Sequence, residues 1–384
     1  MLRSSRSATY RPTLSCLPVA TFRCLDIACL IVRWIRSITK SICVYNDRWH
    51  AGGRWPSSGH ASKEGSIALQ NSIAARAIEL QPASVPALGI DFGGTKIEAV
   101  LLGADGETLW QQRVPNPGTY DTAVAAIAEF VVAADIAGGT ACTVGIGAPG
   151  SPSPRTGVMR NSNSLYLNGR SFSEDLTAVL GRPVRLVNDA NCLALSEATD
   201  GAATGARSVF ALVIGTGVGG GIVLSGACLD GAHGIAGEIG HLPLPWPRSD
   251  ELSPPPCWCS LTGCIESWVS GTGFARAART EHGLSLSAPE IVAAARAGNP
   301  AARAALDAYV DRLGRVLAMV ANLLDPEVVV LGGGMSNVAE IYEELPSIVR
   351  RYAFSDLWEG RIVPARWGDA SGVRGAARLW TGDA

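Results

Sequence analysis

From residue 88 onward, short apolar runs bounded by glycine alternate with segments whose apolar positions have helical spacing. The runs at 88–91, 97–102 and 108–114 predict three strands, with a turn at 103–106. Residues 121–137 carry apolar positions at helical spacing behind an acidic first residue, and they predict a helix. The pattern therefore favours an opening made of hairpins over a strand–helix–strand unit.

A second cycle of the same kind begins at residue 209. Residues 209–214 and 222–225 predict two strands joined by the glycine turn 215–221. Because each cycle opens with a strand, a glycine turn and another strand, we expect an α/β chain of two related lobes around a cleft. The pattern predicts further strands at 142–147, 184–188 and 327–331, and further helices at 172–180, 190–198, 266–281, 288–298, 300–324, 337–351 and 372–381.

The first 80 of the 384 residues differ in kind from the rest. They hold 11 basic and 4 acidic residues, whereas residues 81–384 hold 21 and 30, so the overall charge of −2 averages two unlike parts. Their longest apolar run, 27–32, is far short of the roughly 20 residues of a membrane-spanning helix. No secretory signal is clear. We interpret residues 1–85 as a disordered or non-native basic extension, with a targeting peptide as the alternative.

Three glycine-rich loops are candidates for binding a nucleotide. The first, 91–96, follows a predicted strand, and its paired glycines allow backbone N–H groups to approach a phosphate. It also contains Lys96, the only lysine in residues 81–384. The second, 215–220, matches G-x-G-x-x-G but precedes a strand instead of a helix, which argues against a dinucleotide site. The third, 332–334, leaves room for a base or ribose. A plain β-turn remains the alternative for the first loop alone.

Acidic and imidazole side chains mark a second kind of candidate site. Asp189 lies where a predicted strand gives way to a helix, so it is either a helix cap or a general base at the carboxyl edge of a sheet. A kinase needs one carboxylate there to accept the proton of a substrate hydroxyl. Glu238, His241 and Glu266 lie in glycine-bounded segments and suit a ring of sugar hydroxyls, although each taken alone fits a surface residue or a cap.

Three cysteines and one histidine have the composition of a structural zinc site. Cys257, Cys259 and Cys264 form C-x-C-x4-C, and His241 lies 16 residues before the first of them. Three thiolates and one imidazole suit a closed tetrahedral Zn²⁺ site, whereas an iron–sulfur cluster would want a fourth thiolate. Three buried thiols are the alternative.

Together these segments resemble the ROK sugar-kinase family over essentially all of residues 86–384. The resemblance rests on DFGGTK (91–96), GIGAPG (145–150), NDAN (188–191), IGTGVGGG (214–221), GEIGH (237–241), CWCSLTGCIE (257–266) and LGGGMSN (331–337). Segments 161–169 and 243–246 look most like the bacterial fructokinase branch, and the N-acetylglucosamine kinase branch is next. One departure is Ser260, which replaces the usual glycine after the second cysteine and is expected to strain that turn.

The resemblance implies an actin-like ATPase (ribonuclease H-like) fold with two lobes around a cleft. The expected lobes are 86–200, with 372–384 packing back onto it, and 201–371, which carries the zinc-binding loop. Asp189 corresponds to the catalytic base. The sugar-contacting positions are Asn163, Asn188, Glu238, His241 and Glu266. The nucleotide-binding positions are Asp91, Gly93, Gly94, Thr95, Lys96, Gly215, Thr216, Gly217, Gly219, Gly332, Gly333 and Gly334. The zinc ligands are His241, Cys257, Cys259 and Cys264.

The expected function is ATP-dependent phosphorylation of a hexose at its 6-hydroxyl, with ATP, Mg²⁺ and a structural Zn²⁺ bound. Fructose is the first expected substrate, and N-acetylglucosamine or a broad range of hexoses is the alternative. Ten unevenly spaced cysteines argue against a disulfide framework, so we expect a cytoplasmic protein. We also expect a homodimer that contacts neither nucleic acid nor membrane. A sugar-responsive DNA-binding repressor is the rival, but residues 1–80 lack two clean amphipathic helices joined by a short turn.

Overall fold

The computed structural model describes residues 85–380, which belong to one compact unit. The predicted extension over 1–85 therefore lies outside the described residues except for Val85, as do residues 381–384. None of the helices within 85–380 is long and apolar enough to cross a membrane.

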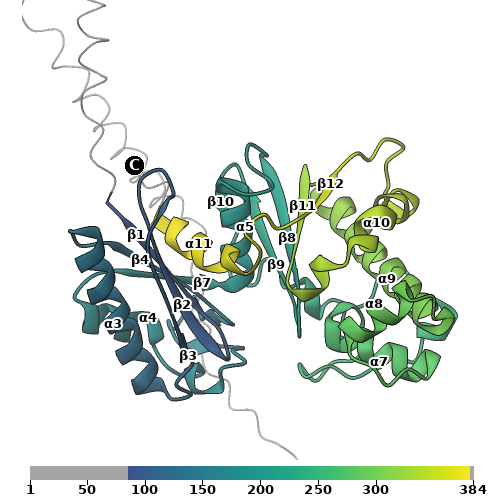
Figure 1. Cartoon of the computed structure of the whole chain (residues 1–384), viewed down its shortest axis with the longest axis horizontal. Coiled ribbons are helices and arrows are strands. Elements are labelled where there is room, and N and C mark those ends of the chain that lie inside the picture. Colours follow the sequence, from purple (N-terminus) through teal and green to yellow (C-terminus); the bar gives the residue numbers. More distant parts are fainter. Residues whose placement is uncertain (1–84, 381–384) are drawn as a thin grey trace, which may run out of the picture. The chain divides into compact units, whose positions relative to one another are not determined.

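The first sheet has five strands in the order β3-β2-β1-β4-β7 (Figure 1). Strand β2 pairs antiparallel with β1 and β3, whereas β4 pairs parallel with β1 and β7 pairs parallel with β4. The strands are β1 (Ala87–Phe92), β2 (Lys96–Leu102), β3 (Thr108–Pro115), β4 (Thr143–Ala148) and β7 (Val184–Asn188).

The second sheet repeats this topology, with the order β10-β9-β8-β11-β12. Again the middle strand of the first three, β9, pairs antiparallel with the other two, β8 and β10. Strand β11 then pairs parallel with β8, and β12 pairs parallel with β11. The strands are β8 (Ser208–Ile214), β9 (Val218–Leu224), β10 (Ala227–Cys228), β11 (Val328–Gly332) and β12 (Arg361–Pro364). The two sequence cycles thus correspond to two sheets of the same design.

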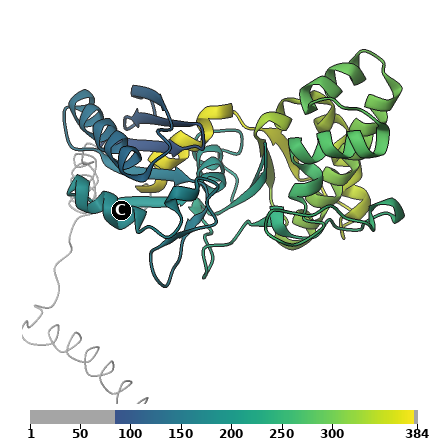
Figure 2. The same cartoon turned by 90° about the horizontal axis from the view of Figure 1, so that it is seen from below.

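Each sheet buries one face against its own set of helices. In the first, Leu88, Ile90 and Phe92 of β1 are fully buried among side chains of α3 (Tyr120–Gly138) and α4 (Phe172–Leu180). The second is covered by the helices drawn in green and yellow-green (Figure 2). These are α6 (Glu266–Val269), α7 (Gly271–His282), α8 (Ala288–Arg296), α9 (Pro300–Leu324) and α10 (Ala339–Tyr352).

Two further helices lie on the opposite faces of the sheets and pack against each other. Helix α11 (Ser371–Ala377) packs on β1 and β4, and α5 (Asp189–Thr199) packs on β8 and β9. Glycines permit the close approach, because a Cβ at Gly145 would lie 2.0 Å from a carbonyl oxygen of α11 and one at Gly221 would lie 2.3 Å from that of Ala190. The start of α5, which carries Asp189, is thereby fixed against the second sheet.

Several details differ from the sequence-based expectations. The helix expected over 266–281 is two helices, because Ser270 adopts an extended conformation and its hydroxyl accepts a hydrogen bond from Gly273 N–H at 2.9 Å. The turn expected over 215–221 ends at Gly217, since β9 begins at Val218. The four-residue edge strand β12 went unpredicted, and the last helix ends at Ala377 and is followed by a 3₁₀ turn.

Candidate active site

A cavity of about 690 Å³ is lined by residues that follow strands of both sheets. From the first sheet come Asn188, which ends β7, and Asp189, which begins α5. From the second come the loop between β8 and β9 and the segments around Glu238 and Trp258. The cavity gathers these predicted residues: Asn163, Asn188, Asp189, Glu238, His241, Glu266, Gly215, Thr216, Gly217 and Gly219.

Asp189 has a carboxylate that faces this cavity. The helix cap is Asn188, whose side-chain oxygen accepts the Ala190 N–H at 2.9 Å. Asp189 Oδ1 accepts the same N–H at 2.8 Å, so its carboxylate shares this donor with the cap. The side chain of Asp189 is accessible from the cavity, but the protein around the cavity separates its carboxylate from bulk water. This burial raises the pKa of Asp189. The capping function thus falls mainly to Asn188, which leaves Asp189 available to a ligand.

Other carboxylates surround the same space. Burial raises the pKa of Glu238, His241 opposes that rise, and the nearby carboxylate of Asp189 adds to it. Glu266 is held at both oxygens, by Trp258 Nε1–H at 2.6 Å and by the N–H of Val218, the first residue of β9, at 3.0 Å. The cavity therefore offers several hydrogen-bond acceptors, as a polyhydroxylated ligand requires.

The first glycine loop lies outside the lining of this cavity, with Asp91, Gly93, Gly94, Thr95 and Lys96 at the junction of β1 and β2. Gly93 N–H donates to the Lys96 carbonyl at 3.0 Å, which closes the loop. Burial, and then the charge of Asp189, raises the pKa of Asp91 to about 7. The two aspartates are thus electrostatically coupled, although only Asp189 lines the cavity.

Lys96 is tethered by a buried carboxylate. Its Nζ lies 3.2 Å from Oε2 of Glu98, which is only 1% exposed. The same Glu98 accepts hydrogen bonds from Arg113 at 2.7 Å and from Gln111 at 2.8 Å. Two cations and one amide on a single carboxylate fix the ammonium of Lys96 beside the loop, where a point charge suits a phosphate.

We expect Asp91→Asn to stabilise the fold in a pH-dependent way. The pKa of Asp91 is 3.8 in the unfolded chain and about 7 in the folded one. Above pH 7 the folded protein bears the full cost of the buried charge, about 1.4 kcal/mol for each unit of pKa difference. That cost disappears as the pH falls from 7 to 4, because the folded state binds the proton. Urea unfolding should show a gain of a few kcal/mol at pH 8 and little gain at pH 4.

Asp356→Asn is the matched control, because Asp356 is exposed. It should change the free energy of unfolding little at either pH. An equal gain for Asp91→Asn at pH 8 and pH 4 would contradict the raised pKa.

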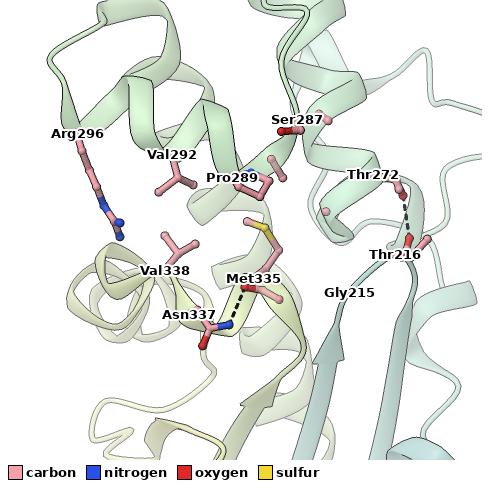
Figure 3. A pocket seen from close by; sticks show the side chains of 14 residues that line it. Gly215, Thr216, Thr272, Ser287, Pro289, Val292, Arg296, Met335, Asn337 and Val338 are labelled. Carbon is pink, nitrogen blue, oxygen red and sulfur yellow. Dashed lines mark hydrogen bonds between the residues drawn. The ribbon is translucent and has the colours of Figure 1, made fainter. Parts of the chain in front are cut away.

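A second cavity, of about 710 Å³, opens beside the β8–β9 loop (Figure 3). Thr216 and Gly334 line it, so it touches two of the predicted glycine loops, whereas Gly332 and Gly333 are not among its lining residues. Its walls are mainly apolar: Pro289 and Val292 of α8 lie across from Met335 and Val338. An apolar slot between two layers of side chains suits a flat ring.

Sequence reasoning missed most residues of this slot. Asn337 and Arg296 also line it, and Arg296 is held by Glu340 of α10 at 2.7 and 2.8 Å. The residues come from the β8–β9 loop, α7, α8 and the 334–338 segment, so no single local motif indicates them. Gly215, Thr216 and Gly334 are the lining residues that the sequence indicated, through the second and third glycine loops.

The four predicted metal ligands are brought together. The ligand atoms of His241, Cys257, Cys259 and Cys264 all lie within 4.8 Å of one another. Cys259 Sγ is 3.6 Å from Cys264 Sγ, and Cys257 Sγ is 3.8 Å from His241 Nδ1. A zinc tetrahedron with arms of about 2.3 Å has edges of about 3.8 Å, so the donor set and its spacing fit Zn²⁺.

Ser260 adopts the left-handed conformation in this metal-ligand loop, with φ of +75°. Its N–H donates to the Cys257 carbonyl at 3.1 Å, which closes the turn between the first two cysteines. A non-glycine residue in this conformation is strained by about 1–2 kcal/mol. The strain expected from a serine at this position is therefore present.

We expect Ser260→Gly to raise the free energy of unfolding by about 0.5–1 kcal/mol. Relief of the left-handed strain exceeds the extra backbone entropy that glycine brings to the unfolded chain. Urea unfolding of the zinc-loaded protein measures the difference. Ser260→Ala keeps the Cβ and should give no gain, so equal stabilisation by alanine would exclude backbone strain as the cause.

The segment after His241 is anchored to α9 by a buried arginine. Arg315, which is fully buried, donates to the carbonyl oxygens of Pro245 at 3.0 Å and Trp246 at 2.8 Å, and pairs with Glu251 at 2.7 Å. Burial acts to raise the pKa of Glu251, but hydrogen bonds, chiefly that from Arg315, lower it to about 2. The segment that follows a predicted metal and sugar ligand is thus held by ionised groups at neutral pH.

The doubled sheets, the helices between them and the cavity lined from both define an α/β protein of the actin-like, two-lobed ATPase fold. The sequence pattern of the ROK family matches residues 87–383, so the chain belongs to the ROK family. This agrees with the resemblance found in the sequence motifs.

Individual relatives refine the comparison. The N-acetyl-D-glucosamine kinase of Pectobacterium atrosepticum is 40% identical over 296 residues, covering 76% of this chain and 97% of that protein. The ROK hexokinase from Thermus thermophilus superimposes with a TM-score of 0.68 at 35% identity, covering 76% of this chain and 97% of that one. A ROK family glucokinase from Streptomyces griseus, solved with glucose and AMPPNP, has a TM-score of 0.63 at 30% identity, covering 77% and 98%. One of these three relatives is named an N-acetyl-D-glucosamine kinase, and none is named a fructokinase, the branch expected first.

Proposed function

We propose that this protein is an ATP-dependent hexose kinase that phosphorylates the 6-hydroxyl of N-acetylglucosamine. The observation that carries the proposal is the cavity in which Asp189 faces Glu238, His241 and Glu266 beside the β8–β9 glycine loop. The name of the relative at 40% identity supports the choice of sugar.

In the proposed reaction the sugar hydroxyl oxygen attacks the γ-phosphorus of ATP while Asp189 accepts the hydroxyl proton. The bond between the γ-phosphorus and its bridging oxygen breaks, and ADP leaves. Asn188, Asn163 and Glu238 hold the other hydroxyls, so that the attacking oxygen is positioned in line. Bound Mg²⁺ would supply positive charge that offsets the charge of the phosphates.

The two cavities divide the nucleotide between them in this proposal. The apolar slot lined by Val292, Met335 and Val338 receives the adenine, and Thr216 lies at the border of both cavities. The phosphates then extend along the loop N–H groups toward Asp189. Zn²⁺ held by His241, Cys257, Cys259 and Cys264 would fasten the loop that carries Glu266.

An ADP-release assay tests the proposal with N-acetylglucosamine, glucose, mannose and fructose on the full chain. We expect the highest kcat/KM for N-acetylglucosamine. Fructose is the competing substrate, favoured by segments 161–169 and 243–246. A higher kcat/KM for fructose would overturn the sugar assignment, and no ADP release with any hexose would overturn the kinase.

Four related expectations stay predictions: the boundaries of the two lobes, a homodimer, a cytoplasmic location and the absence of nucleic-acid binding. Light scattering after gel filtration measures the oligomeric state. A gel shift with the full chain separates a kinase from a DNA-binding repressor, because the basic residues 1–80 would contribute the phosphate contacts of a repressor.

A further inference from the structure

An exposed tryptophan stands in the wall of the polar cavity. Trp258 is 67% exposed although it lines the same cavity as Asp189, Glu238 and His241. Its position in C-x-C identified it only as the residue between two metal ligands. A large aromatic face left open to a cavity is a characteristic of binding surfaces.

The orientation of the indole is fixed by its neighbours. Its Nε1–H donates to Glu266 Oε1 at 2.6 Å, and the ring meets His241 edge-on, with centroids 5.0 Å apart and an interplanar angle of 83°. Both backbone neighbours, Cys257 and Cys259, belong to the four-residue metal-ligand cluster. The side chain is therefore pre-ordered, which lowers the entropic cost of using it to bind a ligand.

The polar group of this side chain has a partner, whereas its ring carbons remain exposed. The only polar group of the indole is already paired with Glu266, so the exposed area is ring carbon. Glu266 and His241, which it contacts, are the residues expected to bind sugar hydroxyls. A ligand whose hydroxyls reach these two residues will place an adjacent ring substituent near the indole.

We propose that Trp258 is a specificity-determining residue whose indole receives the acetamido group of an N-acetylated amino sugar. The inference rests on the proposed function. The acetamido methyl brings apolar surface that the hydroxyl of a plain hexose lacks, and such surface gains from contact with a ring face. Asn188, Asp189 and Glu238 are polar and offer the methyl no such contact, whereas Ile235, which also lines the cavity and is 53% exposed, is the aliphatic side chain that could share it.

The test compares kcat/KM for N-acetylglucosamine and for glucose in the wild type and in Trp258→Ala. The two sugars differ in the group at one carbon, so their ratio reports recognition of the acetamido group. We expect the ratio to fall by about tenfold or more, the discrimination that one apolar group carries in a pocket. Trp258→Phe keeps an aromatic face without the N–H and should retain most of the ratio.

Leu261→Ala is the matched control, because Leu261 is 60% exposed in the same loop but is not among the residues that line the cavity. It should leave the ratio and the zinc content unchanged. Equal losses on both sugars in Trp258→Ala and Trp258→Phe, or an unchanged ratio in Trp258→Ala, would overturn the inference. Calorimetric titration of the wild type with each sugar, without ATP, separates failure of this inference from failure of the proposed function. A wild type that binds neither sugar would overturn the proposed kinase function.

Discussion

Replacing Asp189 with asparagine should lower kcat by about 10²- to 10⁴-fold, the range that a positioned general base contributes. The amide keeps the shape of the carboxylate and can still accept the Ala190 N–H, so the start of α5 stays folded. It cannot accept a proton from a sugar hydroxyl. Steady-state kinetics measure the loss of turnover, and calorimetry should show that sugar affinity is within a few-fold of the wild type.

The matched control is again Asp356→Asn, because this exposed aspartate lies outside both cavities. Its kcat should equal that of the wild type. A kcat of Asp189→Asn near the wild-type value would contradict the assignment of the base. Loss of sugar affinity equal to the loss of kcat would show that Asp189 only holds the sugar.

Removing one metal ligand by Cys259→Ala should release zinc and lower kcat/KM by about 100-fold. His241 belongs to the ligand cluster, and Glu266 lies two residues after Cys264. Loss of the metal should displace these expected sugar ligands, and a displacement of about 1 Å at a reacting site lowers the rate about 100-fold. Plasma emission spectroscopy should find about one zinc per wild-type chain and much less in the variant. Chelation of the wild type should reproduce the loss of activity.

Cys142→Ala is the control for the thiol itself, since Cys142 is buried in the first sheet, away from the cluster. It should keep its zinc. A wild type that holds no zinc after growth with the metal would show that the four residues are a cluster of thiols and one imidazole only. Full activity in zinc-free Cys259→Ala would show that the sugar site does not depend on bound zinc.

Local patterns predicted most of the fold. The helix over 300–324 and the strand over 184–188 were predicted to the residue, because Asn299 and Pro300 mark the helix start and Asp189 marks the strand end. The break at Ser270 was missed, because the apolar spacing of 266–281 continues through it and only the hydrogen bond to Gly273 N–H shows where the second helix starts.

The candidate sites divide in the same way. The four metal-ligand positions and Asp189 stand in compact motifs, so the sequence alone indicated them. The slot beside Met335 is assembled by tertiary packing of α8 against the 334–338 segment, and Trp258 gains its importance from the cavity that it faces. Neither property has a local signature, because both depend on which distant surfaces meet.

The tethered ammonium of Lys96 makes this chain unusually simple to probe by chemistry. Lys40, Lys63 and Lys96 are its only lysines, so a lysine-specific endoproteinase has one cleavage site within residues 81–384. An amine-acylating reagent likewise finds a single side-chain target there, on the loop expected to hold phosphates. On the expectation that this loop holds phosphates, bound nucleotide should slow acylation of Lys96, and mass spectrometry would follow that rate without any enzymatic assay.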